Sequence, residues 1–269
     1  MKNLNTPLFA LSILTLISFQ SFGQSWQLVA GGIDGEVSDY AIYKNELLVT
    51  TTSSDPTKLL VKKLQSNQWI DIGEFKGSMS NIEVSDGKLY IMVGSQDGPD
   101  NSWESEVFIY DDVQEDWIRN SRFDGKIAHM ADYKGKLVIA GEFLGTSYPN
   151  DAEVLQWDGT DWTTIGAFDG YIGSILVWQN QFVCAGDFTK VNNVTVNSMA
   201  SWDGSKWVNT ADKLDKLVGC NDYMHYLRGT HKGKLYTINH CEGGPYNYGA
   251  FWNGSSWTES ELQKNKAYH

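Results

Sequence analysis

The chain has 269 residues, 41% of them hydrophobic, which is enough to bury a substantial core in one large domain or two small ones. Its formal net charge of −12 argues against binding to a nucleic-acid backbone, because that requires a basic surface that releases counterions. The 11 Trp, 13 Tyr and 26 Gly residues are typical of a strand-rich protein with many turns.

The first 23 residues predict a secretory signal peptide. Lys2 supplies positive charge, residues 7–19 are largely apolar, and small residues at Ser21 and Gly23 precede a cleavage point before Gln24. The apolar run is too short for a comfortable membrane span, and no later stretch approaches 18 continuous apolar residues. We therefore expect an exported chain without direct membrane insertion, located in the periplasm, at the outer membrane or outside the cell.

The rest of the chain repeats with a period near 45 residues, marked by Trp residues. A period of this length with several short strands per repeat predicts a propeller or a solenoid. In a representative repeat we expect an inner strand at residues 127–133, a second strand at 137–141, a third at 153–157 and a fourth at 162–166. The marker residues are Trp26, Trp69, Trp117, Trp162, Trp207 and Trp257.

A six-residue motif joins the third and fourth strands of the later repeats. It reads Trp-Asp-Gly-Thr-Asp-Trp at 157–162, Trp-Asp-Gly-Ser-Lys-Trp at 202–207 and Trp-Asn-Gly-Ser-Ser-Trp at 252–257. Asp-Gly and Asn-Gly tolerate positive φ and favour tight turns between antiparallel strands. The second strands end in Ala140-Gly-Glu-Phe143 and Ala185-Gly-Asp-Phe188 in two repeats that align without a gap.

These motifs resemble the repeats of kelch-like β-propellers of the galactose-oxidase type, as they occur in exported bacterial (Bacteroidota-like) proteins. The resemblance covers residues 26–260 and implies an all-β fold of four-stranded blades around a central axis. It implies no activity, because the sequence has no identifiable equivalent of the copper ligands of galactose oxidase.

Five inner-strand hairpins and six Trp-bearing strands predict five blades, with the Trp26 strand joining the last blade to close the ring; six blades are the alternative. We expect residues 24–260 to form this single domain and residues 261–269 to be a short tail.

The three cysteines do not have the spacing of a zinc site. Cys220 and Cys241 fall at the same rim of the fifth repeat and could form a disulfide, whereas Cys184 replaces an apolar residue and is expected in the core. The acidic group at residues 111–116 lacks the pattern of a calcium loop, so we predict a solvated turn. The sequence predicts no metal and no cofactor.

No catalytic motif is recognisable, and the scattered histidines show no convergent pattern on the inner strands. The paired Trp residues could form a sugar-binding platform, but their presence in most repeats favours packing between blades.

The long loops after the second strands are expected at one face of the propeller, together with the connections into the inner strands. Loops on a rigid scaffold often carry binding residues, and exposed aromatic residues are common interface anchors. The candidate partner-binding residues are Trp103, Tyr148, Tyr246, Tyr248, Asp97, Asp100, Asp151 and Glu242.

Three hypotheses of function follow. The first is a non-catalytic interaction subunit that docks onto, caps or plugs an outer-membrane transport or secretion complex from the periplasmic side. The second is a glycan-binding or glycan-active secreted propeller. The third is an enzyme with a site in the central channel, which would need His, Asp or Arg side chains converging from the inner strands.

Overall fold

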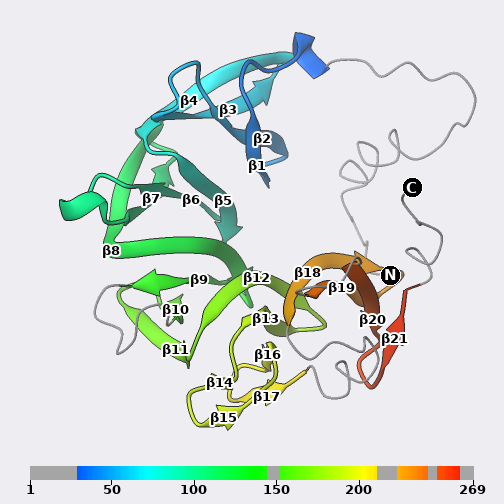
Figure 1. The fold of residues 1–269 in the computed structure, drawn as a ribbon. Helices are drawn as coiled ribbons and strands as arrows, with labels where there is room; N and C mark the ends of the chain where they lie inside the picture. Colours follow the sequence, from blue (N-terminus) through cyan, green and yellow to red (C-terminus); the bar gives the residue numbers. More distant parts are fainter. Residues whose placement is uncertain (1–28, 144–151, 211–222, 242–246, 261–269) are drawn as a thin grey trace, which may run out of the picture.

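The computed structural model describes residues 29–143, 152–210, 223–241 and 247–260 (Figure 1). Apart from two short 3-10 turns, η1 (Val29–Gly31) and η2 (Pro99–Asn101), the regular elements of these residues are β-strands, so the prediction of an all-β fold is confirmed. Within the same residues, none of the helical segments has the length and apolar character needed to cross a bilayer.

The described strands form five antiparallel units of four strands each, placed side by side around a common centre in Figure 1. We number the units 1 to 5 along the chain. Unit 1 contains β1 (Val37–Tyr43), β2 (Glu46–Thr52), β3 (Lys58–Gln65) and β4 (Gln68–Lys76). Unit 2 contains β5 (Met79–Ser85), β6 (Lys88–Ser95), β7 (Glu104–Asp111) and the first half of β8 (Asp116–Tyr133). Unit 3 contains the second half of β8, β9 (Lys136–Phe143), β10 (Ala152–Trp157) and β11 (Trp162–Phe168). Unit 4 contains β12 (Tyr171–Trp178), β13 (Gln181–Asp187), β16 (Met199–Trp202) and β17 (Trp207–Asn209). Unit 5 contains β18 (Tyr223–His231), β19 (Lys234–Cys241), β20 (Asn247–Trp252) and β21 (Trp257–Glu259).

Two elements differ from the expected pattern. The fourth strand of unit 2 and the inner strand of unit 3 are one continuous strand, β8, which joins the two units into a nine-stranded sheet. The loop after β13, expected to be irregular, contains a short hairpin of β14 (Lys190–Val191) and β15 (Val194–Thr195). This hairpin attaches to unit 3, because Val191 pairs with Phe168 of β11.

Four hydrophobic cores lie between successive units. The second strands of units 2, 3 and 4 contribute side chains to the cores on both of their sides, because alternate residues of a strand point to opposite faces. In β13, for example, Phe182 and Cys184 belong to the core between units 3 and 4, whereas Val183 and Ala185 belong to the core between units 4 and 5. The other two cores lie between units 1 and 2 and between units 2 and 3. Cys184 is fully buried.

The Trp at the start of each outer strand links its unit to the preceding one. Each indole Nε1 donates a hydrogen bond to the outer strand before it, three or four residues after the Trp of that strand. The bonds are Trp117 to the Ile72 carbonyl (2.8 Å), Trp162 to Ser121 Oγ (2.8 Å), Trp207 to the Ile165 carbonyl (2.7 Å) and Trp257 to the Thr210 carbonyl (2.9 Å).

Trp69 of unit 1 makes the equivalent contact with the chain segment that precedes the unit. Its Nε1 donates to the Val29 carbonyl at 3.4 Å, and Val29 follows Trp26 by three residues, as Ile72 follows Trp69. The repeat register therefore extends to η1, the first described element.

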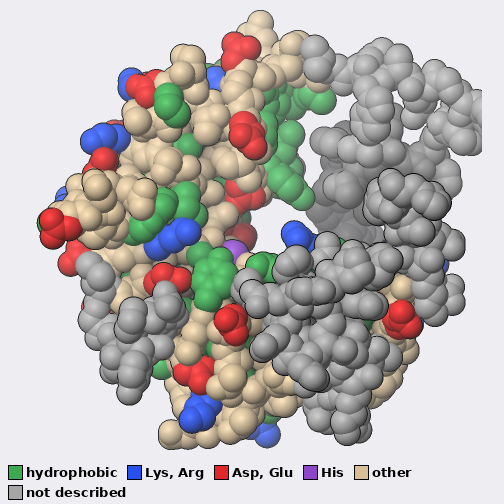
Figure 2. Space-filling model, in the orientation of Figure 1, with side chains coloured by type: hydrophobic (Ala, Val, Ile, Leu, Met, Phe, Trp, Pro, Cys, Tyr) green, Lys and Arg blue, Asp and Glu red, His purple; other side chains and the backbone are tan. Residues whose placement is uncertain are grey.

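One face of unit 1 is not packed against another described unit. On β1, Tyr40 is 68% exposed and Ile42 is 57% exposed, whereas Ala41 and Tyr43 are buried against unit 2. Figure 2 shows hydrophobic side chains along this inner edge of unit 1. Among the described strands, none pairs unit 1 with unit 5, so they do not close the ring.

The Asp-Gly motif forms the turn that the sequence predicts. Gly159, Gly204 and Gly254 have φ values of 104°, 106° and 104°, and the two Trp residues of each motif pair directly across the strands. The sequence analysis missed the cap: in each turn the Asp or Asn side chain accepts backbone N–H groups two and three residues later. For Asp203 the donors are Ser205 and Lys206, at 2.8 and 3.0 Å.

Several predictions lie outside the described residues: the signal peptide at 1–23, the Trp26 strand that would close the ring, the tail at 261–269, and Cys220 of the predicted disulfide. Cys241 is the last residue of β19, and its side chain is not among those described. Unit 5 already has its own outer strand, β21, so a Trp26 strand added there would be a fifth strand.

Candidate binding face at the loop ends of the sheets

The two ends of the sheets are built differently. At one end, which we call the turn face, tight turns join the first strand of each unit to the second and the third to the fourth. At the other end, the loop face, lie the connections from second to third strands and from one unit to the next. The inner turns of the turn face use two residues, such as Lys44-Asn45 and Lys134-Gly135, each with positive φ.

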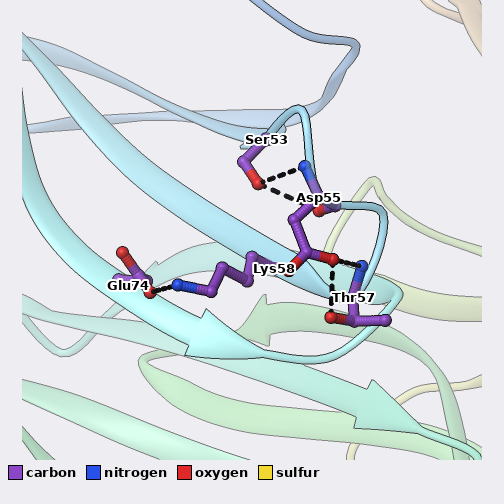
Figure 3. Close-up of polar contacts among 5 residues, drawn as sticks. All are labelled: Ser53, Asp55, Thr57, Lys58 and Glu74. Carbon is purple, nitrogen blue, oxygen red and sulfur yellow. Dashed lines mark hydrogen bonds and ion pairs between the residues drawn. The ribbon is translucent and has the colours of Figure 1, made fainter.

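The first predicted loop, at residues 51–58, closes on itself (Figure 3). Asp55 accepts hydrogen bonds from the Thr57 N–H (3.0 Å) and Oγ1 (2.7 Å), and these bonds lower the pKa of Asp55. Ser53 Oγ accepts the Asp55 N–H at 3.0 Å, and Lys58 Nζ lies 2.5 Å from Glu74 Oε1. These polar groups satisfy one another, so this loop is an ordinary polar turn.

Three predicted partner-binding residues lie in the described part of the loop between β6 and β7. Asp97 forms an ion pair with Lys76 at 3.0 Å, and Asp100 is exposed within η2. Trp103 is half-buried, and Lys126 Nζ lies 5.1 Å from the centroid of its ring. Trp103 is therefore held in place by unit 3 rather than projecting alone.

The structure does not describe the side chains of the other predicted residues. Tyr148, Asp151, Glu242 and Tyr246 lie outside the described residues. Tyr248 is in β20, paired with Asn239, but its side chain is not described.

The structure adds residues that the sequence analysis missed. Lys126, which covers Trp103, pairs across the strands with Glu142 at the end of β9. Tyr171 pairs with Asp187 in the equivalent place of unit 4. Glu142, Tyr171 and Asp187 line one cavity of about 510 Å³ that spans units 3 and 4. Trp103, Lys126, Glu142, Tyr171 and Asp187 thus form one row across the loop face, which we call the loop-face row.

The carboxylates that line this cavity differ in their hydrogen bonding. Asp169 accepts bonds from the Thr189 N–H (2.7 Å) and Oγ1 (2.6 Å) and from the Lys190 N–H (2.7 Å). Burial opposes its ionisation, but these bonds outweigh burial and lower the pKa of Asp169. Burial raises the pKa of Tyr171, and the charges of Tyr226 and Glu142 add to this effect. Within the described chain, Glu142 and Asp187 form no ion pair.

A sequence signal for Glu142 and Asp187 exists in the repeated motif Ala-Gly-acid-Phe at 140–143 and 185–188. The glycines of this motif have a structural cause. A Cβ on Gly141 would lie 2.1 Å from the Lys126 carbonyl oxygen, and one on Gly186 would lie 2.0 Å from that of Tyr171. At each glycine the second strand therefore lies very close to the backbone of the inner strand, and the acidic residue that follows the glycine lies at the loop face.

The inner strands also carry a polar set that the sequence analysis did not find. Asp39, Asn81, His129 and Ser174 occupy equivalent positions, because each pairs with the fifth residue of its second strand: Thr50, Met92, Ala140 and Ala185. β-Bulges in β1, β8 and β12, but not in β5, shift the pairing by one residue and hide this alignment in the sequence. The sequence analysis found no convergent pattern of catalytic residue types on the inner strands, and the structure places this mixed polar set at equivalent positions there.

The Trp pairs are used for packing. The rings of Trp157 and Trp162 have centroids 5.2 Å apart, and Trp207 contacts Phe168 of the preceding unit at 5.2 Å. The acidic turn at 111–116 is also structural, since Asp112 binds Tyr43 (2.7 Å) and Lys44 (2.8 Å) of unit 1. No group of three or more His, Cys, Asp or Glu side chains arranged to hold a metal occurs among the described residues.

Comparisons with known proteins identify the architecture. No protein-family model matches the chain, and no curated protein is significantly similar in sequence. The β-propeller domain of the Trilobed protease from Pyrococcus furiosus, which has an open velcro topology, superposes with a TM-score of 0.54 and 12% identity over 83% of this chain and 68% of that chain. The tricorn protease gives a TM-score of 0.51 and 12% identity over 84% of this chain but only 22% of its own. At these identities the similarity shows the fold alone, and the chain is a β-propeller.

Proposed function

We propose that the chain is an exported, non-catalytic β-propeller that binds a protein partner through its loop face. The observation that carries the proposal is the loop-face row, which extends from unit 2 to unit 4 and ends in two carboxylates without ion pairs among the described residues. Aromatic side chains next to charges at the rim of a surface are typical of protein interfaces. The acidic carboxylates favour a basic patch on the partner.

The partner we propose is an outer-membrane transport or secretion complex, which the propeller would dock onto, cap or plug from the periplasmic side. The motivation is the predicted signal peptide together with an acidic body of net charge −12. Export is tested first: the mature protein isolated from a diderm host should begin at Gln24. An N-terminus at Met1 in the cytosolic fraction would contradict the export step.

The docking experiment is affinity purification of the tagged protein from detergent-solubilised envelopes, followed by mass spectrometry. We expect a stoichiometric outer-membrane protein with the native chain. A loop-face variant with Glu142→Lys and Asp187→Lys should lose it, because both free carboxylates are reversed. A matched turn-face variant with Glu115→Lys and Asp161→Lys carries the same change in charge and should retain the partner. Equal retention by both variants would place the interface elsewhere.

The fold-level part of the proposal is a ring of five blades closed through the Trp26 segment. It is supported by Trp69, whose indole contacts Val29 as the later indoles contact the outer strand before them. Replacing Trp26 by Ala should lower the urea midpoint of unfolding by as much as Trp257→Ala does. An unchanged midpoint would favour a ring that stays open or is completed by a sixth blade.

Glycan binding is the second candidate. The supporting observation is that Tyr171 lies in one cavity with the carboxylates of Glu142, Asp169 and Asp187, a combination of ring and hydrogen-bond acceptors that suits sugar hydroxyl groups. Gel retardation in soluble polysaccharides separates the two candidates. Retardation that Tyr171→Ala abolishes, with no protein recovered from envelopes, would favour the glycan.

A further inference from the structure

A second cavity lies at the centre of the propeller and is separate from the loop-face row. It has a volume of about 500 Å³ and is lined by β1, β5, β8 and β12, the inner strands of units 1 to 4. Figure 2 shows acidic side chains, a histidine and a basic side chain around the central opening. The polar residues that line the cavity are Asp39, Tyr40, Asn81, Glu83 and His129.

Two polar atoms of this lining are buried without a partner. Within the described chain, Asn81 Oδ1 and His129 Nε2 have no hydrogen-bond partner. The Asn81 amide nitrogen is already used, because it donates to Asp39 Oδ2 at 3.2 Å. Leaving buried polar atoms unpaired costs stability, about 1–3 kcal/mol for each group. Such atoms in a cavity wall indicate that they serve something other than the fold.

His129 contributes a neutral imidazole to the cavity wall. Burial keeps the pKa of His129 below its usual value, although the backbone carbonyl groups of Ile172 and Gly173 in the next unit oppose this shift. A neutral imidazole has one nitrogen that accepts hydrogen bonds, and within the described chain Nε2 has no partner. With the proton on Nδ1, Nε2 offers its lone pair to a donor in the cavity.

Glu83 adds a carboxyl group whose charge is poorly solvated. Burial, with smaller contributions from the charges of Asp132 and Asp39, raises the pKa of Glu83 to about 7, although the Val84 N–H donates to it at 3.0 Å. The titratable groups that face it are Asp39 on β1 and His129 and Asp132 on β8. No Lys or Arg is part of the described lining.

We propose that the central cavity binds a small organic cation that carries a primary ammonium group on an apolar or aromatic body. The ammonium group has donors and no acceptor, which matches a wall whose free polar atoms are acceptors: Asn81 Oδ1, His129 Nε2 and the Glu83 carboxylate. The body of the ligand is matched by Ile42, Met130 and Ile175, and the exposed ring of Tyr40 offers a face to the cation. Anions fit less well, since the described lining has no Lys or Arg and its unpartnered buried atoms are acceptors.

Proton release is part of the binding. A cation favours the ionised form of Glu83, so affinity should rise as pH increases through about 7, where Glu83 loses its proton. Protonation of His129 at lower pH opposes cation binding in the same direction. The pH dependence therefore distinguishes this cavity from adsorption to exposed carboxylates, which titrate near pH 4.

The test is ligand-observed saturation-transfer NMR of the full chain with 2-phenylethylamine, and with 2-phenylethanol as a neutral control of similar shape. We expect saturation transfer to the amine and not to the alcohol, with an affinity at pH 8 at least about fivefold higher than at pH 6. Glu83→Gln should weaken amine binding about tenfold and remove most of its pH dependence, leaving the smaller contribution of His129. Tyr40→Ala, at an exposed position, should also weaken it.

The control variant is Glu74→Gln on the outer strand β4, which should bind the amine as the native chain does. Circular dichroism establishes that each variant is folded. Equal saturation transfer to amine and alcohol, no transfer to the amine at either pH, or an unchanged affinity in folded Glu83→Gln would each overturn the proposal.

Discussion

The outer strands and the inner strands of the propeller link neighbouring units through different kinds of residue. On the outside, one residue type recurs: in units 2 to 5 a Trp donates its indole N–H to the outer strand before it, and in unit 1 Trp69 donates to Val29 of η1. On the inside, the equivalent positions hold different residues, namely Asp39, Asn81, His129 and Ser174. Repetition on the outside indicates a contact that every unit needs.

The inner residues also link neighbouring units, but incompletely. Asp39 Oδ2 accepts the Ile82 N–H at 3.0 Å, and Ser174 Oγ accepts the Leu227 N–H at 2.7 Å. Asn81 and His129 leave one atom each unpaired among the described residues. Residues that are both variable and incompletely paired are poor choices for stability alone. The outer Trp contacts therefore serve the fold, whereas the inner positions line the central cavity for which we propose a ligand.

The largest effect should come from removing one of the Trp residues that link neighbouring outer strands. Trp207 is 4% exposed, contacts Phe168 and Trp202, and donates to the Ile165 carbonyl at 2.7 Å. Trp207→Ala should reduce the free energy of unfolding by about 3–5 kcal/mol, measured by urea denaturation with circular dichroism. The control is Trp69→Ala, whose hydrogen bond is longer at 3.4 Å and whose ring is half-buried, so its loss should be smaller. Equal losses would show that the contribution of these Trp residues to stability does not depend on their burial.

The contact of an outer Trp can also be disrupted by a substitution on the strand that accepts its hydrogen bond. A Cβ on Gly73 would lie 2.5 Å from Trp117 Nε1, at the site of its bond to Ile72. Gly73→Ala should therefore destabilise the protein by about 1–3 kcal/mol through overpacking. Gly94→Ala is the matched control, because a Cβ there has contacts no closer than 3.6 Å. A loss in Gly94→Ala as large as that in Gly73→Ala would assign the effect to strand glycines in general.

Much of the outer ring could be predicted from the sequence. The Trp spacing and the Asp-Gly turns depend on local chemistry, so the strands and their order follow from pattern alone. The hydrogen bond from Trp to the preceding outer strand could not be predicted, although small residues at Gly73, Ser121 and Gly166, four residues after a Trp, were a visible trace of it.

The equivalent polar positions on the inner strands could not be found by aligning the repeats. The two central repeats align without a gap, yet the equivalence of Asp39, Asn81 and His129 depends on bulges that two of the three strands contain. A bulge is a property of strand pairing, which involves residues distant in the sequence. The loop-face residues Glu142 and Asp187 were visible as a motif, but only pairing with Lys126 and Tyr171 shows that they share a face.

Replacing Glu83 should change the stability by a smaller amount, and the direction of the change depends on pH. Its pKa is about 7 in the folded protein and 4.5 in the reference state, so the folded state binds more protons between these values. Its contribution to stability is therefore fully present below pH 4.5 and is lost as pH rises through 7. Glu83→Gln should make the protein more stable than the native chain at pH 8, by on the order of 1–2 kcal/mol after allowance for solvent screening. Near pH 4 the two should unfold at the same urea concentration; a constant difference at both pH values would show that packing and not charge is responsible.

The smallest effect is expected on the turn face, at the cap of the Asp-Gly motif. Asp203 accepts bonds from Ser205 and Lys206, and these bonds lower its pKa to about 2, yet the group is fully exposed. Asn253 makes the same bonds to Ser255 and Ser256 with an amide oxygen, so Asp203→Asn should leave the urea midpoint at pH 7 unchanged. Because the depressed pKa stabilises the native chain only above the unfolded value near 4, the Asn variant should lose less stability on acidification to pH 2. Asp203→Ala removes the acceptor and should lower the midpoint at both pH values; a loss in Asn as large as in Ala would mean that the charge, rather than the acceptor, holds this turn.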